Sequence, residues 1–235
     1  MASDDRCTAF VAGATGYVGR EVVRELCEAG HRTIAHVRPD SPKLAEWQAQ
    51  FSLLGAEVCT AAWTLEAMSE ALAGYSISHV FALLGTTKSR AKEEELEGDI
   101  YQAVDYGLTK ILLEAALKTS PAPRFVYLSS VGAKADSRSS YLRVRGQVEE
   151  ELAASGLSWM AAQPSIITGY DRDVDRPLER WGATVGDSLL RMGSLLGGAK
   201  VRARYQSTSA TQLAAALVAL GCSEVTGTQL GDALR

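Results

Sequence analysis

Three glycines placed directly after a short apolar run constrain the fold of this chain most strongly. They are Gly13, Gly16 and Gly19. They follow the run Thr8–Ala12, and the next segment, Tyr17–Ala29, has apolar residues at helical spacing. The first glycine permits a tight turn, the second lets a bound group approach the backbone, and the third permits close packing of helix on strand. The pattern therefore predicts a strand, a glycine-rich turn and a helix.

Apolar runs and amphipathic segments alternate along the chain as far as Pro164. We expect strands at residues 8–12, 32–37, 56–61, 79–84, 124–128 and 157–162, and helices near 17–29, 42–51, 64–72, 99–118 and 141–155. Such alternation indicates parallel pairing through right-handed crossovers, and strands that are apolar throughout belong to a sheet covered on both faces. The predicted fold class is therefore α/β, a doubly wound parallel sheet of the Rossmann type.

The C-terminal part of the chain breaks this rhythm. Residues 165–235 are richer in turns, with helices expected near 178–192 and 208–220. We predict that residues 1–235 form one domain, in which 165–235 contribute a small substrate cap on the carboxyl edge of the sheet.

The turn after the first strand is typical of a pyrophosphate site. N–H groups at the start of a helix face the phosphates, and the helix dipole favours negative charge. A glycine motif alone is weak support, but here a strand precedes it, a helix follows it and a second strand comes at the expected distance. The alternative is a glycine-rich turn without a ligand. The residues predicted to contact a dinucleotide here are Gly13, Thr15, Gly16, Tyr17, Val18 and Gly19.

The end of the second strand indicates which dinucleotide to expect. NAD-selective sites place an acidic residue there to bind the ribose 2′-hydroxyl. This chain has Arg38 instead, and Asp40 comes only beyond Pro39. An arginine can pair with a 2′-phosphate and stack on adenine, so we predict NADP(H). Ser41 and Lys43 are candidates for further phosphate contacts, and the alternative for Arg38 is a plain surface charge.

Composition argues against several other classes of protein. A net charge of −4 does not suit a general nucleic-acid surface, which needs a cationic face. No apolar run is long enough to span a bilayer, and residues 1–6 contain no apolar signal core. We therefore expect a cytoplasmic monomer or homodimer whose partner is a small-molecule substrate, with no nucleic-acid or membrane partner.

The cysteines and histidines predict no metal site. None of the four cysteines forms a Cys-x-x-Cys pair, so we expect reduced thiols, and the histidines lack metal-like spacing. These residues are Cys7, Cys27, Cys59 and Cys222, and His31, His36 and His79.

Four motifs together resemble those of the atypical short-chain dehydrogenase/reductases. They are the glycine turn, Leu84-Gly85-Thr86-Thr87, Leu128-Ser129-Ser130-Val131-Gly132-Ala133, and the block 141–149, which begins Tyr141-Leu142-Arg143-Val144-Arg145. The resemblance covers residues 8–170 and is nearest the Tat-interacting oxidoreductase-like branch. It implies a hydride-transferring fold that uses NADP(H).

The resemblance also implies roles for individual residues. The family uses a serine after the fifth strand and a tyrosine in Tyr-x-x-x-Lys to handle a carbonyl or alcohol. Carried onto this chain, Tyr141 is the general acid or base, and the serine is Ser130 in preference to Ser129. Arg145 occupies the lysine position. A guanidinium keeps the positive charge but does not simply reproduce the bonds of an ammonium to ribose hydroxyls.

Three further positions depart from the family pattern. Asp105 stands in the long helix where many relatives carry asparagine, and Gln163 stands where related sequences often have arginine. After the third strand, where relatives often place an aspartate, this chain has Ala61-Ala62-Trp63.

The positions of the strand ends predict the same ligand site independently of the family resemblance. The ends of strands four, five and six should meet at the carboxyl edge of the sheet, where doubly wound folds bind ligands. A phenol with a pKa of about 10 is a poor base at neutral pH, and Arg145, one helical turn after Tyr141, is the nearby cation. The further residues predicted to contact the cofactor are Leu84, Gly85, Thr86, Ser129, Tyr141, Arg145, Pro164 and Ser165.

These observations support three hypotheses for function. The first is an NADP(H)-dependent oxidoreductase that reduces a small carbonyl compound by hydride transfer. The second is a non-catalytic NADP(H)-binding regulatory or sensor protein, which the replaced lysine favours. The third is an isomerase or epimerase that uses the cofactor transiently. Fold alone does not separate them, because function depends on the site.

Overall fold

The computed structural model describes residues 6–86, 99–164, 167–168, 208–230 and 233–234. Within these residues, seven parallel strands form one sheet in the order β3-β2-β1-β4-β5-β6-β9. The strands are β1 (Thr8–Ala12), β2 (Arg32–His36), β3 (Glu57–Cys59), β4 (His79–Ala82), β5 (Arg124–Leu128), β6 (Trp159–Gln163) and β9 (Gly227–Leu230). A separate parallel pair joins β7 (Ile167–Thr168) to β8 (Thr208–Ser209).

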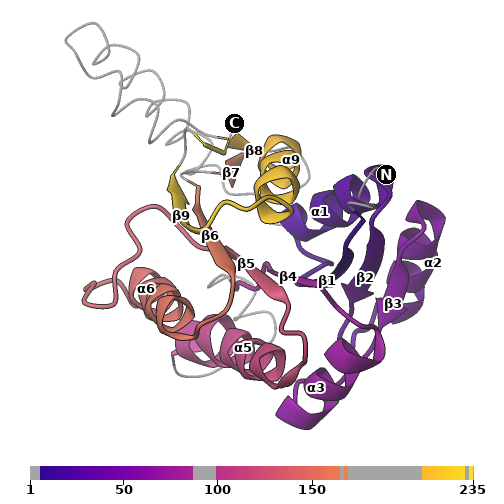
Figure 1. Ribbon diagram of the computed structural model, residues 1–235, viewed down its shortest axis with the longest axis horizontal. Helices are drawn as coiled ribbons and strands as arrows, with labels where there is room; N and C mark the ends of the chain where they lie inside the picture. The colour runs from indigo at the N-terminus through magenta and orange to yellow at the C-terminus, as the bar shows by residue number, and fades with distance from the viewer. Residues whose placement is uncertain (1–5, 87–98, 165–166, 169–207, 231–232, 235) are drawn as a thin grey trace, which may run out of the picture.

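Helices cover both faces of the sheet, as Figure 1 shows. One face carries α1 (Tyr17–Glu28), α2 (Leu44–Leu54) and α9 (Ala210–Gly221). The other carries α3 (Leu65–Gly74), the π-helix η1 (Tyr101–Leu108), α5 (Thr109–Lys118) and α6 (Ser140–Ala154). Alternate side chains of each strand enter the two apolar clusters, so that Val126 packs on the α1 face and Phe125 on the other. The predicted doubly wound α/β fold is confirmed.

The apolar face of α1 and the N-cap of α3 agree with the sequence pattern, whereas the start of α2 differs from it. The predicted apolar face of α1 is buried, and Thr64 caps α3 by accepting the N–H of Ala67. The helix expected near 42–51 begins later, at Leu44. Ser41 lies in two successive turns, because its N–H donates to the carbonyl of Arg38 and its own carbonyl accepts the N–H of Leu44, where α2 begins.

Residues 210–230 contribute a helix and a strand to the layers of the sheet. Leu213 and Leu217 of α9 are fully buried against α1 and the sheet, and β9 pairs in parallel with β6. The sequence pattern predicts that this stretch belongs to a substrate cap, but its helix covers a sheet face, because its apolar side chains pack there. The helix expected near 178–192 lies outside the described residues, and a cap formed by the remaining C-terminal residues stays a prediction.

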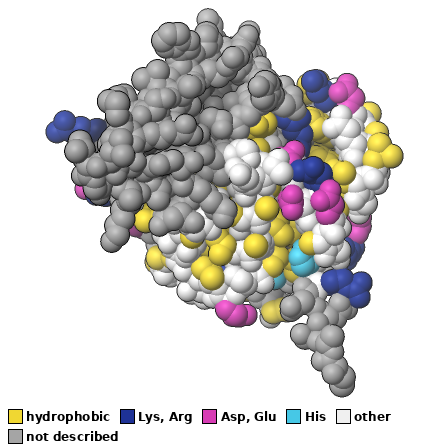
Figure 2. Space-filling model, turned by 90° about the horizontal axis from the view of Figure 1, so that it is seen from above, with side chains coloured by type: hydrophobic (Ala, Val, Ile, Leu, Met, Phe, Trp, Pro, Cys, Tyr) yellow, Lys and Arg dark blue, Asp and Glu magenta, His cyan; other side chains and the backbone are white. Residues whose placement is uncertain are grey.

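Two observations describe the surface and the helices of the described residues. On the face shown in Figure 2, basic and acidic side chains lie near one another, and the described part of that face shows no broad basic patch. Every helix in the described ranges is too short or too polar to cross a membrane.

Candidate active site

The turn between β1 and α1 is built from backbone atoms that approach one another closely. Gly13 has a φ of +82°, in the left-handed region that favours glycine. A Cβ on Gly13 would lie 2.6 Å from the carbonyl oxygen of Leu83, and one on Gly19 would lie 2.1 Å from that of Gly13. Side chains at these positions would therefore separate β1, α1 and the end of β4.

The start of α1 is suited to an anion. Its N-cap is Gly16, no side chain caps it, and its first turn contains no acidic residue. By contrast, Thr64, Ser139 and Ser209 cap α3, α6 and α9 with their side chains. A helix leaves its first N–H groups without partners inside the helix, and its dipole is positive there. The turn lies between β1 and β4, where the strand order reverses and ligands of such sheets bind.

Arg38 lies just after β2 at the same edge. Its side chain is half exposed, and its Nε is 3.7 Å from a carboxylate oxygen of Asp40, which is largely exposed. An exposed pair of this kind contributes little stability, so Arg38 can exchange Asp40 for another anion. Lys43 is exposed beside the start of α2.

The departure after the third strand has a packing explanation. His36, the last residue of β2, is buried and its Nε2 is 2.8 Å from the carbonyl oxygen of Ala61. Its ring meets the edge of Trp63 at a centroid distance of 4.8 Å. Burial lowers the pKa of His36, so the ring is neutral at physiological pH and packs as part of the core.

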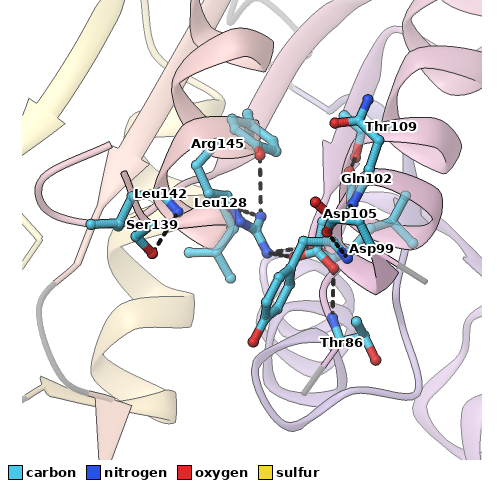
Figure 3. A network of polar contacts seen from close by, with 12 residues as sticks. Thr86, Asp99, Gln102, Asp105, Thr109, Leu128, Ser139, Leu142 and Arg145 are labelled. Atoms are coloured by element: carbon cyan, nitrogen blue, oxygen red, sulfur yellow. Dashed lines mark hydrogen bonds and ion pairs between the residues drawn. The ribbon is translucent and has the colours of Figure 1, made fainter. Parts of the chain in front are cut away.

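Arg145 joins the ends of two strands to two helices. It is 4% exposed, so it is not a surface charge. Its Nη1 donates to the carbonyl of Leu128 at 2.7 Å and to the hydroxyl of Tyr127 at 3.2 Å. Its Nη2 donates to Asp105 at 2.6 Å and to the carbonyl of Leu84 at 3.0 Å. We call these five residues the Arg145 junction; Figure 3 shows its centre.

Asp105 is the anionic partner of Arg145. It is fully buried, and its second carboxylate oxygen accepts the N–H of Thr86 at 2.9 Å. Burial raises the pKa of Asp105, and the guanidinium of Arg145 opposes that effect. Two positions that depart from the family pattern, aspartate for asparagine and arginine for lysine, therefore form one ion pair. The sequence alone does not indicate this pair, because the two residues are 40 positions apart.

A π-helical segment carries Asp105. The N–H of Thr109 bonds to the carbonyl of Tyr106, whereas in an α-helix it would bond to that of Asp105. The hydroxyl of Thr109 donates to the Asp105 carbonyl instead, at 2.6 Å. The predicted long helix over 99–118 begins as the π-helix η1, and such segments occur frequently at functional sites.

Tyr141 lies at the start of α6, against the guanidinium of Arg145. The Cζ of Arg145 is 5.2 Å from the centre of the Tyr141 ring, and the ring of Tyr101 meets Tyr141 edge-on at 5.4 Å. This is a cation–π contact with the ring face, not a hydrogen bond to the hydroxyl. Asp99 fixes the same helix end by accepting the hydroxyl of Ser140 at 2.5 Å, which lowers the pKa of Asp99.

The two serines after β5 have different surroundings. Ser129 is buried, and its hydroxyl donates to the carboxylate of Glu149. The side-chain amide of Gln163 donates to both oxygens of Glu149, at 2.9 and 3.0 Å. The glutamine that replaces the arginine of related sequences therefore has Glu149 as its partner. Ser130 is half buried, and its hydroxyl has no hydrogen-bond partner in the described ranges.

Glu149 was missed as a site residue in the sequence. It follows Arg145 by four residues and Tyr141 by eight, so the helical period places all three on one side of α6. That spacing was the available signal.

The other predicted site residues lie along the same edge. A Cβ on Gly85 would be 2.7 Å from Nη2 of Arg145, so this glycine permits the close approach of the guanidinium. Pro164 is buried at the end of β6, and its carbonyl accepts the N–H of Val131 at 3.0 Å. Thr15 is half buried in the glycine turn, and Ser165 lies outside the described residues.

Comparisons with known proteins agree with this geometry. The sequence profile of a family described as NAD(P)H-binding matches residues 13–187. The chain is 30% identical over 173 residues to the mitochondrial protein FMP52-1 of Scheffersomyces stipitis, across 73% of this chain and 71% of the relative. It is also 30% identical over 171 residues to a ceramide reductase of Caulobacter vibrioides, across 72% of this chain. The match spans only 49% of that reductase.

A solved structure has the same fold. A short-chain dehydrogenase/reductase family oxidoreductase from Burkholderia thailandensis superposes with a TM-score of 0.61 at 19% identity, over 96% of this chain and 90% of that one.

The expectation of a cytoplasmic protein is contradicted. FMP52-1 of S. stipitis is named as mitochondrial, and so are the FMP52 proteins of Debaryomyces hansenii and Candida albicans. Composition and the lack of an apolar signal core were insufficient grounds for that expectation.

The family profile covers most of the chain, and its matched region contains both the glycine turn and the Arg145 junction. This protein belongs to the NAD(P)H-binding family of Rossmann-fold proteins, among the FMP52-like atypical short-chain dehydrogenase/reductases.

Proposed function

We propose that this protein is an NADP(H)-dependent oxidoreductase that reduces the carbonyl group of a small compound. The observation that carries the proposal is the position of Tyr141 and Ser130 at the carboxyl edge that also holds the glycine turn. Neither hydroxyl has a hydrogen-bond partner within the described ranges. The Arg145 junction, by contrast, is buried and hydrogen-bonded. Two uncommitted hydroxyls at the same edge of the sheet as the glycine turn are suited to a carbonyl oxygen.

The residues present fit a dinucleotide. The uncapped start of α1 would hold the pyrophosphate, and Gly16 would let it approach the backbone. Arg38 would pair with the 2′-phosphate in place of Asp40, which is the basis for preferring NADP(H). When bound, the reduced nicotinamide supplies the hydride.

The side chains of this protein would handle the oxygen of the substrate. Ser130 would donate a hydrogen bond to the carbonyl oxygen and polarise it, and Tyr141 would donate the proton that forms the alcohol. Because both hydroxyls act on the same oxygen, reduction requires both of them to reach it while the carbonyl carbon faces the nicotinamide.

Arg145 would act mainly by positioning Tyr141. Its two Nη groups are committed to Leu84, Asp105, Tyr127 and Leu128, so they are unavailable to a ribose. Its Nε is buried and has no hydrogen-bond partner among the described residues. An unpaired buried donor is rare in proteins, and this N–H is suited to donate to the oxygen of a bound hydroxyl. This single N–H would replace the contacts of the usual lysine.

The committed guanidinium also favours a second candidate, a non-catalytic NADP(H)-binding regulator. A family member that has lost its mobile lysine cation could bind the cofactor and respond to its redox state without turnover. The two candidates share the binding site and differ in whether Tyr141 transfers a proton.

The test measures binding and turnover together. NADPH and NADH binding is followed by fluorescence titration, and NADPH oxidation is followed with aldehydes, ketones and quinones. A ceramide-derived ketone joins the panel because one relative is a ceramide reductase. Tyr141→Phe and Ser130→Ala are the site variants, and Tyr106→Phe, on η1, is the matched control.

Three results are informative. Turnover that falls at least about 100-fold in Tyr141→Phe, with unchanged NADPH affinity, supports the reductase, since general acid catalysis contributes about that much. Tight NADPH binding without turnover supports the regulator. Failure to bind either cofactor overturns both candidates.

A further inference from the structure

Two cysteines that are 215 residues apart in the sequence meet at the edge of the sheet opposite to the candidate active site. Cys7 directly precedes β1, and Cys222 is the C-cap of α9. Their Sγ atoms are 3.8 Å apart and share a hydrogen bond. Because all seven strands run in parallel, the start of β1 lies far from the carboxyl edge, so this pair is separate from the site above.

The backbone holds both cysteines in place. The N–H of Cys7 donates to Nδ1 of His31 at 3.2 Å, and its carbonyl accepts the N–H of Arg32 at 3.0 Å. The N–H of Cys222 donates to the carbonyl of Val218 at 2.9 Å. The start of β1 and the end of α9 therefore hold the two sulfur atoms close together.

The two thiols are electrostatically unequal. The Nε of Arg124 donates at 2.7 Å to the carbonyl of Gly221, the residue before Cys222, so the guanidinium lies next to that thiol. The hydrogen bond from Cys7 and the charge of Arg124 lower the pKa of Cys222. The same shared proton raises the pKa of Cys7, which is also more deeply buried. Loss of the proton is therefore favoured at Cys222, which is also the less buried of the two residues.

The other two cysteines provide an internal comparison. Cys27 is half buried and Cys59 is buried, and burial raises the pKa of each. Within the described residues neither contacts another sulfur. They therefore lack both features of the Cys7–Cys222 pair, a neighbouring thiol and an adjacent cation.

We propose that Cys7 and Cys222 are a redox pair that a peroxide converts to a disulfide. The thiolate of Cys222 attacks a peroxide oxygen, the O–O bond breaks, and a sulfenic acid forms while the departing oxygen leaves as water after protonation. The sulfur of Cys7 then attacks the sulfenic sulfur, the S–O bond breaks, and the hydroxide takes the Cys7 proton and leaves as water. Two thiols lose two electrons in total, which the peroxide gains.

The geometry permits the second step. A disulfide bond is about 2.05 Å long, so the two sulfur atoms, now 3.8 Å apart, must approach by about 1.8 Å. A disulfide would tie the end of α9 to the start of β1 and close a long loop. Closing so long a loop constrains the unfolded chain strongly, and we expect a rise in Tm on the order of 5–10 °C.

A metal ion fits the same cluster less well. Ligand atoms of Cys7, His31 and Cys222 lie within 4.8 Å of one another. However, Nδ1 of His31 already accepts the N–H of Cys7, and structural zinc sites have four protein ligands, whereas the described residues offer three here.

The test is oxidation of the full chain with hydrogen peroxide, followed by alkylation and non-reducing peptide mapping. We expect the loss of two alkylatable thiols, one linked peptide containing Cys7 and Cys222, a higher Tm, and reversal of all three by dithiothreitol. In Cys7→Ser, Cys222 should stop at a sulfenic acid that dimedone traps. Cys27→Ser is the matched control and should still form the disulfide.

Three outcomes would overturn the proposal. They are equal oxidation of Cys27 or Cys59, dimedone adducts that accumulate on Cys222 of the unsubstituted protein without a linked peptide, and one equivalent of zinc in the isolated protein that protects both thiols. If Cys7→Ser does not fold, Cys222→Ser replaces it, because loss of the linked peptide with unaltered Cys27 and Cys59 tests the same point.

Discussion

The glycine turn and the Arg145 junction lie along the same edge of the sheet but are built in different ways. In the turn, backbone atoms are so close that a Cβ would meet them at 2.1 Å on Gly19 and 2.6 Å on Gly13. In the junction, side chains from β5, η1 and α6 meet the backbone ends of two strands, and Asp105 and Arg145 are 40 residues apart in sequence. The turn therefore requires particular residues locally, whereas the junction requires partners that match.

The end of β4 links the two regions. The carbonyl of Leu83 faces Gly13, and the carbonyl of the next residue, Leu84, accepts from Arg145. A change in the junction could therefore move the turn. The following predictions separate the two regions or show that they act together.

Gly19→Ala should have the largest effect. The added methyl would lie 2.1 Å from the carbonyl oxygen of Gly13, so α1 must move away from the turn. We expect NADPH affinity to fall at least about 100-fold, because the start of α1 would no longer face the pyrophosphate. Fluorescence titration measures the affinity, and thermal melting reports whether the fold is retained.

Gly74→Ala is the control for this substitution. A Cβ on Gly74 would meet no atom within 4 Å, and the residue ends α3. It should stabilise the protein by about 0.5–1 kcal/mol or leave it unchanged. Wild-type NADPH binding by a folded Gly19→Ala protein would show that the turn is not the cofactor site.

Asp105→Asn should have the next largest effect, on stability. It removes the anion from a buried guanidinium, and breaking a buried ion pair costs about 3–5 kcal/mol. Arg145→Lys restores the residue types that relatives carry, so we expect the two substitutions together to cost less than their sum. The coupling free energy of contacting residues is typically about 0.5–3 kcal/mol.

Urea unfolding of the two single variants and the double variant measures this coupling. Additive losses would mean that the pair does not compensate for the two departures. NADPH affinity, measured on the same proteins, tests whether the regions are independent. A parallel loss of affinity in Asp105→Asn would show that the junction supports the turn through the end of β4.

The sequence supported prediction of the doubly wound fold because strand and helix patterns are local. The turn could be predicted for the same reason, since its three glycines lie at short spacing between one strand and one helix, and Gly16 and Gly19 both face Gly13. The junction could not, because Asp105, Arg145 and Glu149 find their partners only after β4, β5 and α6 are assembled. Residues 210–230 were predicted to belong to a cap because the alternation of strands and helices breaks after Pro164. The apolar pattern of α9 indicates that this helix is buried, but not against which surface.

Arg38→Ala should change cofactor preference. If Arg38 pairs with the 2′-phosphate, its loss should weaken NADPH binding about 10-fold, or about 1.4 kcal/mol, and leave NADH binding unchanged. Titration with both cofactors measures the ratio. Lys43→Ala is the matched control, because Lys43 is exposed beside the start of α2 and should matter less. Equal losses for NADPH and NADH would remove the basis for the NADP(H) preference.

Ser129→Ala should have the smallest effect, and it distinguishes the two serines. The hydroxyl of Ser129 donates to the Glu149 carboxylate, which Gln163 also holds, so its loss should cost about 1 kcal/mol of unfolding free energy. Ser130→Ala removes a hydroxyl without a partner in the described ranges and should change stability by less than about 0.5 kcal/mol. Urea unfolding measures both. Equal losses of stability would mean that Ser130 also has a structural partner, and the assignment of the substrate oxygen to Ser130 would then lose its basis. A stability loss confined to Ser129 would instead place that serine with the side-chain network of α6 and leave Ser130 for the ligand.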